Sequence, residues 1–394
     1  MYVRSLVVAG LWLALGLITA ATVIGLVTLW PESGEIEPPQ GLRRPPTLGA
    51  EIVAIASTPC SVPGQSTCRR VTVELREGPD AGARPSFTMF DPPDRLDLDV
   101  GDRIRVSESA LPEGAQLGGV AVDRYTLADF ERGRPLLLLA LGFVALVVAT
   151  GRWKGLRALV GLAASLLILV MFVVPAILDG ASPPGVALVG SLAIMLVTLV
   201  VTHGLGPKLL AAALGTSSAL LLTLALGSLS VEVAHLTGLT SDEAIFLRAT
   251  TGEISISGLL LAGMVIGALG VLDDLTVTQS SLVLALRRAN PSLGFRRLFR
   301  EAVGVGHDHI AATVNTLVLA YAGAALPILL IFSLGDTEFT DAVNSESVAS
   351  EVVATLVGSI GLIAAVPLTT AIAAVLATRL APGEIRDAEH GHVH

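Results

Sequence analysis

Two adjacent carboxylates, Asp273 and Asp274, lie near the middle of an otherwise apolar, glycine-rich stretch from residue 258 to residue 286. The stretch is long enough to cross a bilayer, whose hydrocarbon core is roughly 30 Å thick. An ionised Asp at the membrane centre costs about 2.5–3.5 kcal/mol on insertion scales. A carboxylate at this depth is expected to be paired, protonated or turned toward a polar cavity. We therefore interpret the pair as a candidate site for coupling to protons or ions.

The spacing of small and polar residues around the pair is helical. One stripe, with steps of three or four residues, contains Gly263, Gly267, Gly270, Asp274 and Thr278. Glycines on such a stripe let a neighbouring helix approach closely, so we expect a packing seam that ends at Asp274. Asp273 lies about 100° around the helix, which favours Asp274 as the functional member of the pair.

The next apolar segment offers partners for this carboxyl group. Asn315 and Thr316 belong to its polar cluster, and an antiparallel arrangement would bring Asn315 to the depth of Asp274. An amide or hydroxyl can hydrogen-bond a carboxyl group in either protonation state. In the last apolar segment, Gly358 and Gly361 predict a second closely packed helix.

Enzymatic interpretations fit the sequence less well. Intramembrane aspartyl proteases need two carboxyl groups that face each other from different helices, whereas both acids here lie on one helix. His307, Asp308 and His309 resemble an interfacial polar cap, and the tail histidines His390, His392 and His394 resemble a disordered end. No nucleotide-binding glycine loop is present. We expect a protein that is not an enzyme, with no metal site and no cofactor. A purely structural role, in which the two aspartates only join helices, stays open.

The composition indicates what positions these residues. The chain has 394 residues, of which 52% are hydrophobic and 15% charged, and this profile is typical of a multi-span membrane protein. The net charge of −9 argues against nucleic acid as a partner. About eight segments are long enough to span a bilayer: residues 6–30, 135–151, 157–178, 186–203, 209–229, 258–286, 308–334 and 352–378.

The distribution of Lys and Arg predicts the orientation, because cytoplasmic loops carry them in excess. With the N-terminus inside, the cytoplasmic segments contain a basic cluster at residues 152–157 and another at residues 287–300. We expect the second cluster to form a separate amphipathic helix that lies at the membrane surface or, as the alternative, docks a cytoplasmic partner. The chain is then a multi-pass protein of the cytoplasmic membrane with both termini in the cytoplasm.

Residues 31–134 form the one long non-membrane block, which this orientation places outside. Its short alternating runs predict an all-β domain of the SH3 or OB kind, inserted after the first helix. Cys60 and Cys68, the only cysteines, lie in this block, and an oxidising compartment favours a disulfide between them. The predicted domains are a membrane anchor (1–30), the extracytoplasmic β-domain with its tether (31–134), a seven-helix membrane domain (135–378) and a cytoplasmic tail (379–394).

Several long runs have distinctive patterns, namely residues 263–281, 288–299 and 306–327, with shorter ones at 153–159, 234–238 and 358–367. Together they resemble the YibE/F family of bacterial integral membrane proteins. Asp274 matches the family position, whereas Asp273 and His307 depart from the family pattern. The succession of a span with a central acid, a basic loop and a span with an Asn-Thr pair is also similar to the proton-using half of SecF and other RND-type proteins.

These patterns lead to two functional hypotheses. The first is a transporter or proton-coupled membrane motor, in which Asp274 titrates and the outer domain handles an unknown small solute or a partner. The second is a non-transporting accessory or assembly factor whose outer domain binds envelope proteins. In both, the lipid bilayer is the main surrounding partner.

Overall fold

The computed structural model describes residues 2–32, 46–58, 68–90, 98–109, 116–117, 120–121, 123–251, 254–335 and 338–380. The chain divides into two compact units. One comprises Pro38–Leu146, and the other comprises Met1–Glu37 together with Val147–His394. The predicted domain limits at residues 30, 134 and 378 stay predictions.

The smaller unit is built on an antiparallel five-stranded sheet. Its strands, in the order β3-β2-β1-β4-β7, are Ser86–Phe90, Cys68–Leu75, Thr47–Thr58, Arg103–Glu108 and Tyr125–Phe130. A two-stranded sheet pairs β5 (Gln116–Leu117) with β6 (Val120–Ala121). Strand β2 alternates as predicted, because Val71, Val73 and Leu75 are buried between exposed or half-buried residues. The described part of this unit is thus a small sheet, and its classification as an SH3- or OB-like barrel stays a prediction.

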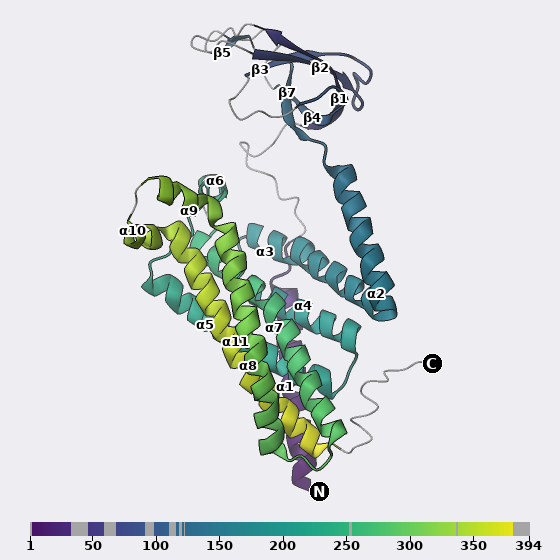
Figure 1. Ribbon diagram of the computed structural model, residues 1–394, viewed down its shortest axis with the longest axis vertical. Helices are drawn as coiled ribbons and strands as arrows, with labels where there is room; N and C mark the ends of the chain where they lie inside the picture. The colour runs from purple at the N-terminus through teal and green to yellow at the C-terminus, as the bar shows by residue number, and fades with distance from the viewer. Residues whose placement is uncertain are drawn as a thin grey trace. The chain divides into compact units, whose positions relative to one another are not determined.

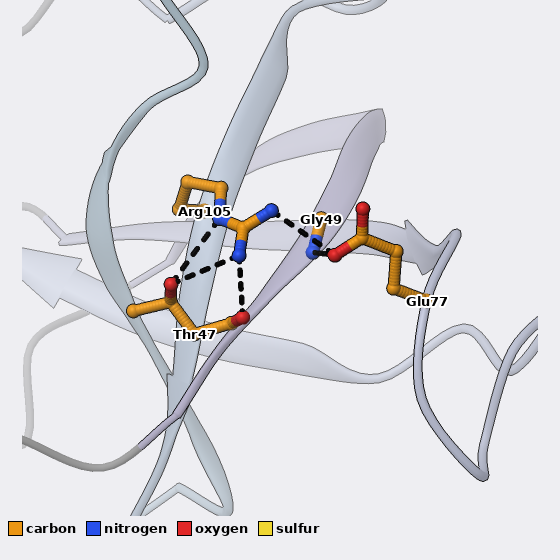
Figure 2. Close-up of polar contacts among 4 residues, drawn as sticks. All are labelled: Thr47, Gly49, Glu77 and Arg105. Atoms are coloured by element: carbon orange, nitrogen blue, oxygen red, sulfur yellow. Dashed lines mark hydrogen bonds and ion pairs between the residues drawn. The ribbon is translucent and has the colours of Figure 1, made fainter. Parts of the chain in front are cut away.

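Polar side chains join β4 to its neighbour β1 (Figure 2). Arg105 Nη2 donates to the Thr47 carbonyl oxygen at 2.6 Å, and its Nη1 donates to Glu77 Oε2 at 3.0 Å. The same carboxylate oxygen accepts the backbone N–H of Gly49 at 3.1 Å. One acidic side chain thereby binds both a neighbouring guanidinium and the backbone of β1.

The two cysteines differ in how far the structure describes them. Cys68 is buried at the start of β2. Cys60 lies outside the described residues, and the disulfide between the two therefore stays a prediction.

The larger unit is a bundle of helices (Figure 1). It begins with α1 (Tyr2–Thr28), and α2 (Gly133–Ile168) enters it from the smaller unit. A short π-helix (Leu169–Val173) and α3 (Val174–Leu178) continue α2. The other helices are α4 (Pro183–His203), α5 (Pro207–Val233), α6 (Asp242–Thr251), α7 (Ile256–Ala289), α8 (Phe295–Ala324), α9 (Leu326–Leu334), α10 (Phe339–Asn344) and α11 (Glu346–Arg379).

Within the described residues, six helical stretches are long and apolar enough to cross a membrane, or seven if the bent pair α8 and α9 counts as one span. The expected spans 135–151 and 157–178 fall in one of these stretches, Gly133–Leu178. Its backbone leaves the helical region at Arg152, where φ is 49° and ψ is −128°. The expected span 308–334 is the bent pair, whose helices meet at 59° just before Pro327. Helix length and composition thus support six or seven spans in the described residues, and the expected number of about eight stays a prediction.

Three long helices form the core of the bundle. Helices α5, α7 and α11 pack on one another, α4 lies against α7, and α8 lies against α11. Figure 1 shows α7, α8 and α11 running side by side. Helix α5 contributes the most buried segment, with Leu209, Leu210 and the following three alanines fully enclosed.

The basic segment after α7 differs from the expectation. Helix α7 runs on to Ala289 and α8 begins at Phe295, so the basic cluster is divided between the end of one long helix and the start of the next. The expected separate surface helix is instead the first three turns of α8. The reason is that a five-residue turn closes the hairpin, which leaves no room for an independent element.

Candidate functional site

The carboxylate that contacts other helices is Asp273. Its side chain is half-buried, and Oδ2 lies 3.4 Å from Thr198 Oγ1 on α4. The Thr198 hydroxyl also donates to the carbonyl oxygen of Met195 at 3.0 Å. The other oxygen, Oδ1, is buried and has no hydrogen-bond partner in the described part of the chain. Asp273 therefore keeps unused hydrogen-bonding capacity inside the bundle.

One turn further along α7, a pair of buried hydroxyls joins α7 to α5. Thr276 Oγ1 and Thr216 Oγ1 are 2.7 Å apart. Thr276 also donates to the backbone carbonyl of Asp273 at 3.2 Å. Ser280 follows on the same face and donates to the carbonyl of Thr276 at 2.7 Å. Polar groups thus continue along α7 on the side that faces the core.

Gln279 links this face to two more helices. Its Nε2 donates to the Ala302 carbonyl of α8 at 2.7 Å and to Thr370 Oγ1 of α11 at 2.8 Å. Gly306 makes room for the amide, because a Cβ there would lie 2.6 Å from Val366 Cγ1 and 3.1 Å from Gln279 Nε2. We use the term polar layer for the side chains of these three neighbouring contacts along α7, namely Thr198 with Asp273, Thr216 with Thr276, and Gln279 with Thr370.

Other hydroxyls in the bundle are buried without a partner. In the described residues these are Ser191 on α4, Thr223 on α5, and Ser359 and Thr369 on α11. A buried polar group without a hydrogen bond costs about 1–3 kcal/mol, so such groups are rare in folded proteins. Their concentration on the helices that form the polar layer gives the bundle interior a capacity to hydrogen-bond a polar guest.

The predicted glycine seam lies on a different face of α7. Gly263, Gly267, Gly270, Asp274 and Thr278 are all exposed. A Cβ at Gly263 or Gly270 would meet no atom within 4 Å, and one at Gly267 would meet only the Tyr321 hydroxyl of α8 at 3.2 Å. In the single chain, the glycine stripe is an outer face.

The expected partners of Asp274 are also exposed. Asn315 and Thr316 lie on the outer side of α8, and Thr316 donates to the Ala312 carbonyl of its own helix at 3.0 Å. Contacts between α7 and α8 occur near Gly267 and Gln279, and Asp274 lies between these two levels. Among the described residues, neither Asp274 nor Asn315 makes a side-chain hydrogen bond or an ion pair, so the structure does not bring the two together.

The glycines of α11 also differ from each other. A Cβ at Gly361 would lie 2.3 Å from Thr223 Oγ1 of α5, so this glycine is at a close helix contact. A Cβ at Gly358 would meet no atom within 4 Å. Close packing between α5 and α11 is therefore centred on Gly361 and on Gly215, whose ideal Cβ position is 2.0 Å from Thr369 Oγ1.

Sequence reasoning missed four members of the polar layer: Thr198, Thr216, Gln279 and Thr370. Gln279 carries a usable signal, because a buried amide in an apolar span needs partners. The threonines carry almost none, since a hydroxyl can bond to its own helix four residues back. Among the residues that the structure describes, no three His, Cys, Asp or Glu side chains gather as metal ligands do. The tail histidines lie outside those residues, while His307, Asp308 and His309 are exposed on α8.

The match to a protein family covers this whole site. A family model described as YibE/F-like protein matches residues 139–379. The chain belongs to the YibE/F family. The matched region runs from α2 to the end of α11 and contains the polar layer, so the resemblance noted in the sequence is confirmed. Together with its long apolar helices, this identifies the YibE/F family protein as an integral, multi-pass membrane protein. Searches of curated proteins and of solved structures found no match.

Proposed function

We propose that this YibE/F family protein is a transporter or proton-coupled membrane motor in which Asp273 carries the proton. The observation that supports this most directly is the position of the Asp273 carboxyl group at the α4–α7 contact. One of its oxygens approaches Thr198, and the other is buried without a partner. The Asp273 end of the polar layer connects α7 with α4 and α5, and its Gln279 end connects α7 with α8 and α11.

The hydrogen bonds around Asp273 suit a group that alternates between two states. When neutral, the carboxyl group donates to Thr198 Oγ1, which passes its own hydrogen to the Met195 carbonyl. When ionised, the carboxylate competes with that carbonyl for the single hydroxyl hydrogen, and no cation among the described residues pairs with it. Deprotonation therefore favours a different arrangement of α4 against α7, because an unpaired charge inside a membrane is costly.

Infrared difference spectroscopy tests the assignment of the proton. The full chain in nanodiscs is compared between acidic and alkaline buffer for wild type, Asp273→Asn and Asp274→Asn. We expect the band of a protonated carboxyl group in apolar surroundings to disappear in Asp273→Asn and to persist in Asp274→Asn. The family position argues for Asp274, so loss of the band in Asp274→Asn alone would transfer the role to that residue.

A flux measurement tests the coupling itself. Protein in liposomes with an imposed pH gradient is exposed to a panel of small solutes, and proton movement is followed with an enclosed dye. Asp273→Asn is expected to abolish solute-dependent proton flux, whereas Asp273→Glu, which keeps the acid, retains part of it. Unchanged flux in Asp273→Asn would refute proton coupling through this residue.

The proposal includes an orientation and a setting. The protein is placed in the cytoplasmic membrane with both termini in the cytoplasm and residues 31–134 outside, as the distribution of Arg and Lys favours. The smaller unit, Pro38–Leu146, is taken to be a small barrel of the SH3 or OB kind. The protein is taken not to be an enzyme, and its substrate is a small solute rather than nucleic acid.

The separate sheet unit supports a second candidate function. It has its own buried core, which includes Ile52, Val73 and Ile104, as a binding module for another envelope protein would. A stoichiometric partner that is lost on deletion of residues 43–130, with no effect from Asp273→Asn or Asp274→Asn, would favour this accessory role over transport.

A further inference from the structure

One end of the helical bundle contains a large cavity that the polar layer does not reach. Its volume is about 1050 Å³, and its walls come from the α3–α4 turn, the end of α5, α6 and the start of α7. Binding sites for small molecules usually measure about 300–1,000 Å³. Leu261 lies in the cavity wall, in the second turn of α7, and is about 18 Å along the helix axis from Asp273.

Opposite charges face this cavity without neutralising each other. Glu232 of α5 and Arg248 of α6 both line it. Neither forms an ion pair or a side-chain hydrogen bond among the residues that the structure describes. The hydroxyls of Ser182, Ser255 and Ser257 also lie in the wall. The site therefore presents a carboxylate and a guanidinium, each without a partner in the described residues, to the same open cavity.

The helix ends around the cavity add partial charges of both signs. Ser182 and Ser255 stand just before the first residues of α4 and α7, at the positive ends of the two helix dipoles. Glu232 stands in the last turn of α5, where carbonyl groups make it negative. The cavity is thus positive near the starts of α4 and α7 and negative near the end of α5.

His235 on the cavity wall has a strained backbone. It follows α5 with φ at 51°, and its N–H donates to the Glu232 carbonyl at 3.2 Å while that of Leu236 donates to Val231 at 3.0 Å. This is a Schellman turn, in which the left-handed position is normally glycine. A side chain there costs about 1–2 kcal/mol, and strain of this kind concentrates at binding sites.

The turn that carries His235 is clamped from a third helix. Glu346 at the start of α11 accepts the N–H groups of Thr237 at 2.5 Å and of Gly238 at 2.6 Å, and the Thr237 hydroxyl at 2.8 Å. Gly238 has φ at 80°, and a Cβ there would lie 2.6 Å from the Ile256 carbonyl oxygen. The wall is therefore held in place between α5, α7 and α11 before any ligand arrives.

We propose that this cavity binds a small zwitterion of the amino-acid type. The carboxylate of the ligand pairs with Arg248, its ammonium group pairs with Glu232, and His235 contacts the remainder. Arg suits the first role because its planar guanidinium binds a carboxylate through two parallel hydrogen bonds. The inference names the solute class of the proposed transport function and rests on that function.

Binding by the full-length protein in nanodiscs tests the proposal. The twenty proteinogenic L-amino acids are the probes, measured by calorimetry or thermal shift. At least one is expected to bind, while its N-acetyl derivative, which lacks the positive charge, and its methyl ester, which lacks the negative charge, bind about tenfold more weakly or less. Absence of binding by all twenty, or equal binding of the N-acetyl derivative, would overturn the zwitterion assignment.

Variants locate the site and separate binding from folding. Arg248→Gln and Glu232→Gln are expected to weaken binding about tenfold or more, whereas the control Glu243→Gln, on the same helix as Arg248 but not in the cavity wall, leaves it unchanged. His235→Gly relieves the strained turn, so it should raise the unfolding temperature and still weaken binding. Unchanged affinity in both charge variants would place the ligand elsewhere.

The binding assay and the flux measurement together distinguish failure of the two proposals. Asp273→Asn is expected to bind the zwitterion normally and to lose coupled flux. Binding without any effect of Asp273→Asn on flux would retain the cavity and refute the coupling residue. Coupled flux without zwitterion binding would retain the coupling residue and refute the solute class.

Discussion

At the scale of single residues, Asp273 and Asp274 show how a 100° step around a helix separates two identical groups. Asp273 faces α4 and the polar layer, while Asp274 shares the exposed face of α7 with its glycines. Glycines on an isolated helix predict a packing seam. In the bundle, the packing face of α7 consists instead of residues such as Leu272, Thr276 and Gln279.

Tyr125 illustrates the same scale in the sheet unit. Its ring is buried in the sheet core, and its hydroxyl donates to Asp80 Oδ2 at 3.2 Å. Burial, and then the hydrogen bond to Asp80, raise the pKa of Tyr125 above its ordinary value, with Arg124 opposing them. Because the pKa is raised on folding, the contribution of Tyr125 to stability is complete below about pH 10 and declines as the pH rises above that value.

We therefore expect Tyr125 to ionise later than an ordinary tyrosine. A spectrophotometric titration of tyrosinate absorbance in the full chain, compared with that of Tyr125→Phe, isolates this residue from the other two tyrosines. The difference curve should have its midpoint above about pH 10. A midpoint at or below that value would contradict the buried position of the ring.

At the scale of elements, α5 and α11 are joined by two reciprocal contacts between a glycine and a threonine. Gly215 of α5 faces Thr369 of α11, and Gly361 of α11 faces Thr223 of α5. The contacts are not equally tight. At Gly215, a Cβ would meet Thr369 Cβ at 2.9 Å and its Cα at 3.3 Å, whereas at Gly361 it would meet only the Thr223 hydroxyl closer than 3.6 Å.

Alanine substitutions should follow this difference. Gly215→Ala is expected to destabilise the bundle by about 1–3 kcal/mol, because the α11 backbone must move. Gly361→Ala is expected to be milder, since rotation of one hydroxyl relieves it, and Thr223→Ala should restore its stability. Gly263→Ala is the control, because a Cβ there meets nothing within 4 Å. Unfolding in a mixed-detergent series measures the ranking, and equal losses at Gly215 and Gly263 would contradict the packing.

The sequence predicts the helices whose position is determined by the length of an apolar segment. The expected segments 186–203, 209–229, 258–286 and 352–378 each lie within one helix, from α4 to α11. Hydropathy does not show where a helix continues past the membrane, so α7 and α8 extend further into the basic segment than expected. Strand β7 was missed because Tyr125–Phe130 has a less regular alternation than β2.

At the scale of the whole molecule, the proposed orientation predicts which exposed positions face outward. Ser86 at the start of β3, Asp341 in α10 and Ser292 between α7 and α8 are all exposed. An impermeant maleimide applied to intact cells should label a cysteine at Ser86 or Asp341 and should miss one at Ser292. The wild-type chain measures any background from Cys60 and Cys68. Labelling at Ser292 with protection at Ser86 would reverse the orientation and with it the side on which the zwitterion cavity opens.

The break in the helix at Arg152 affects whether the number of membrane crossings is even or odd. An unbroken helix over Gly133–Leu178 would be about 69 Å long, more than twice the hydrocarbon thickness. Instead, an ideal Cβ on Gly155 would lie 2.3 Å from the Val147 carbonyl oxygen, although eight residues of helix rise about 12 Å. If each half crosses the membrane and the bent pair of α8 and α9 counts as one span, the crossings are even in number and both chain ends share a side. If only one does, the number is odd, and every segment after α3 changes sides relative to the N-terminus. The break in the helix at Arg152 therefore bears on which side of the membrane the segments after α3 lie.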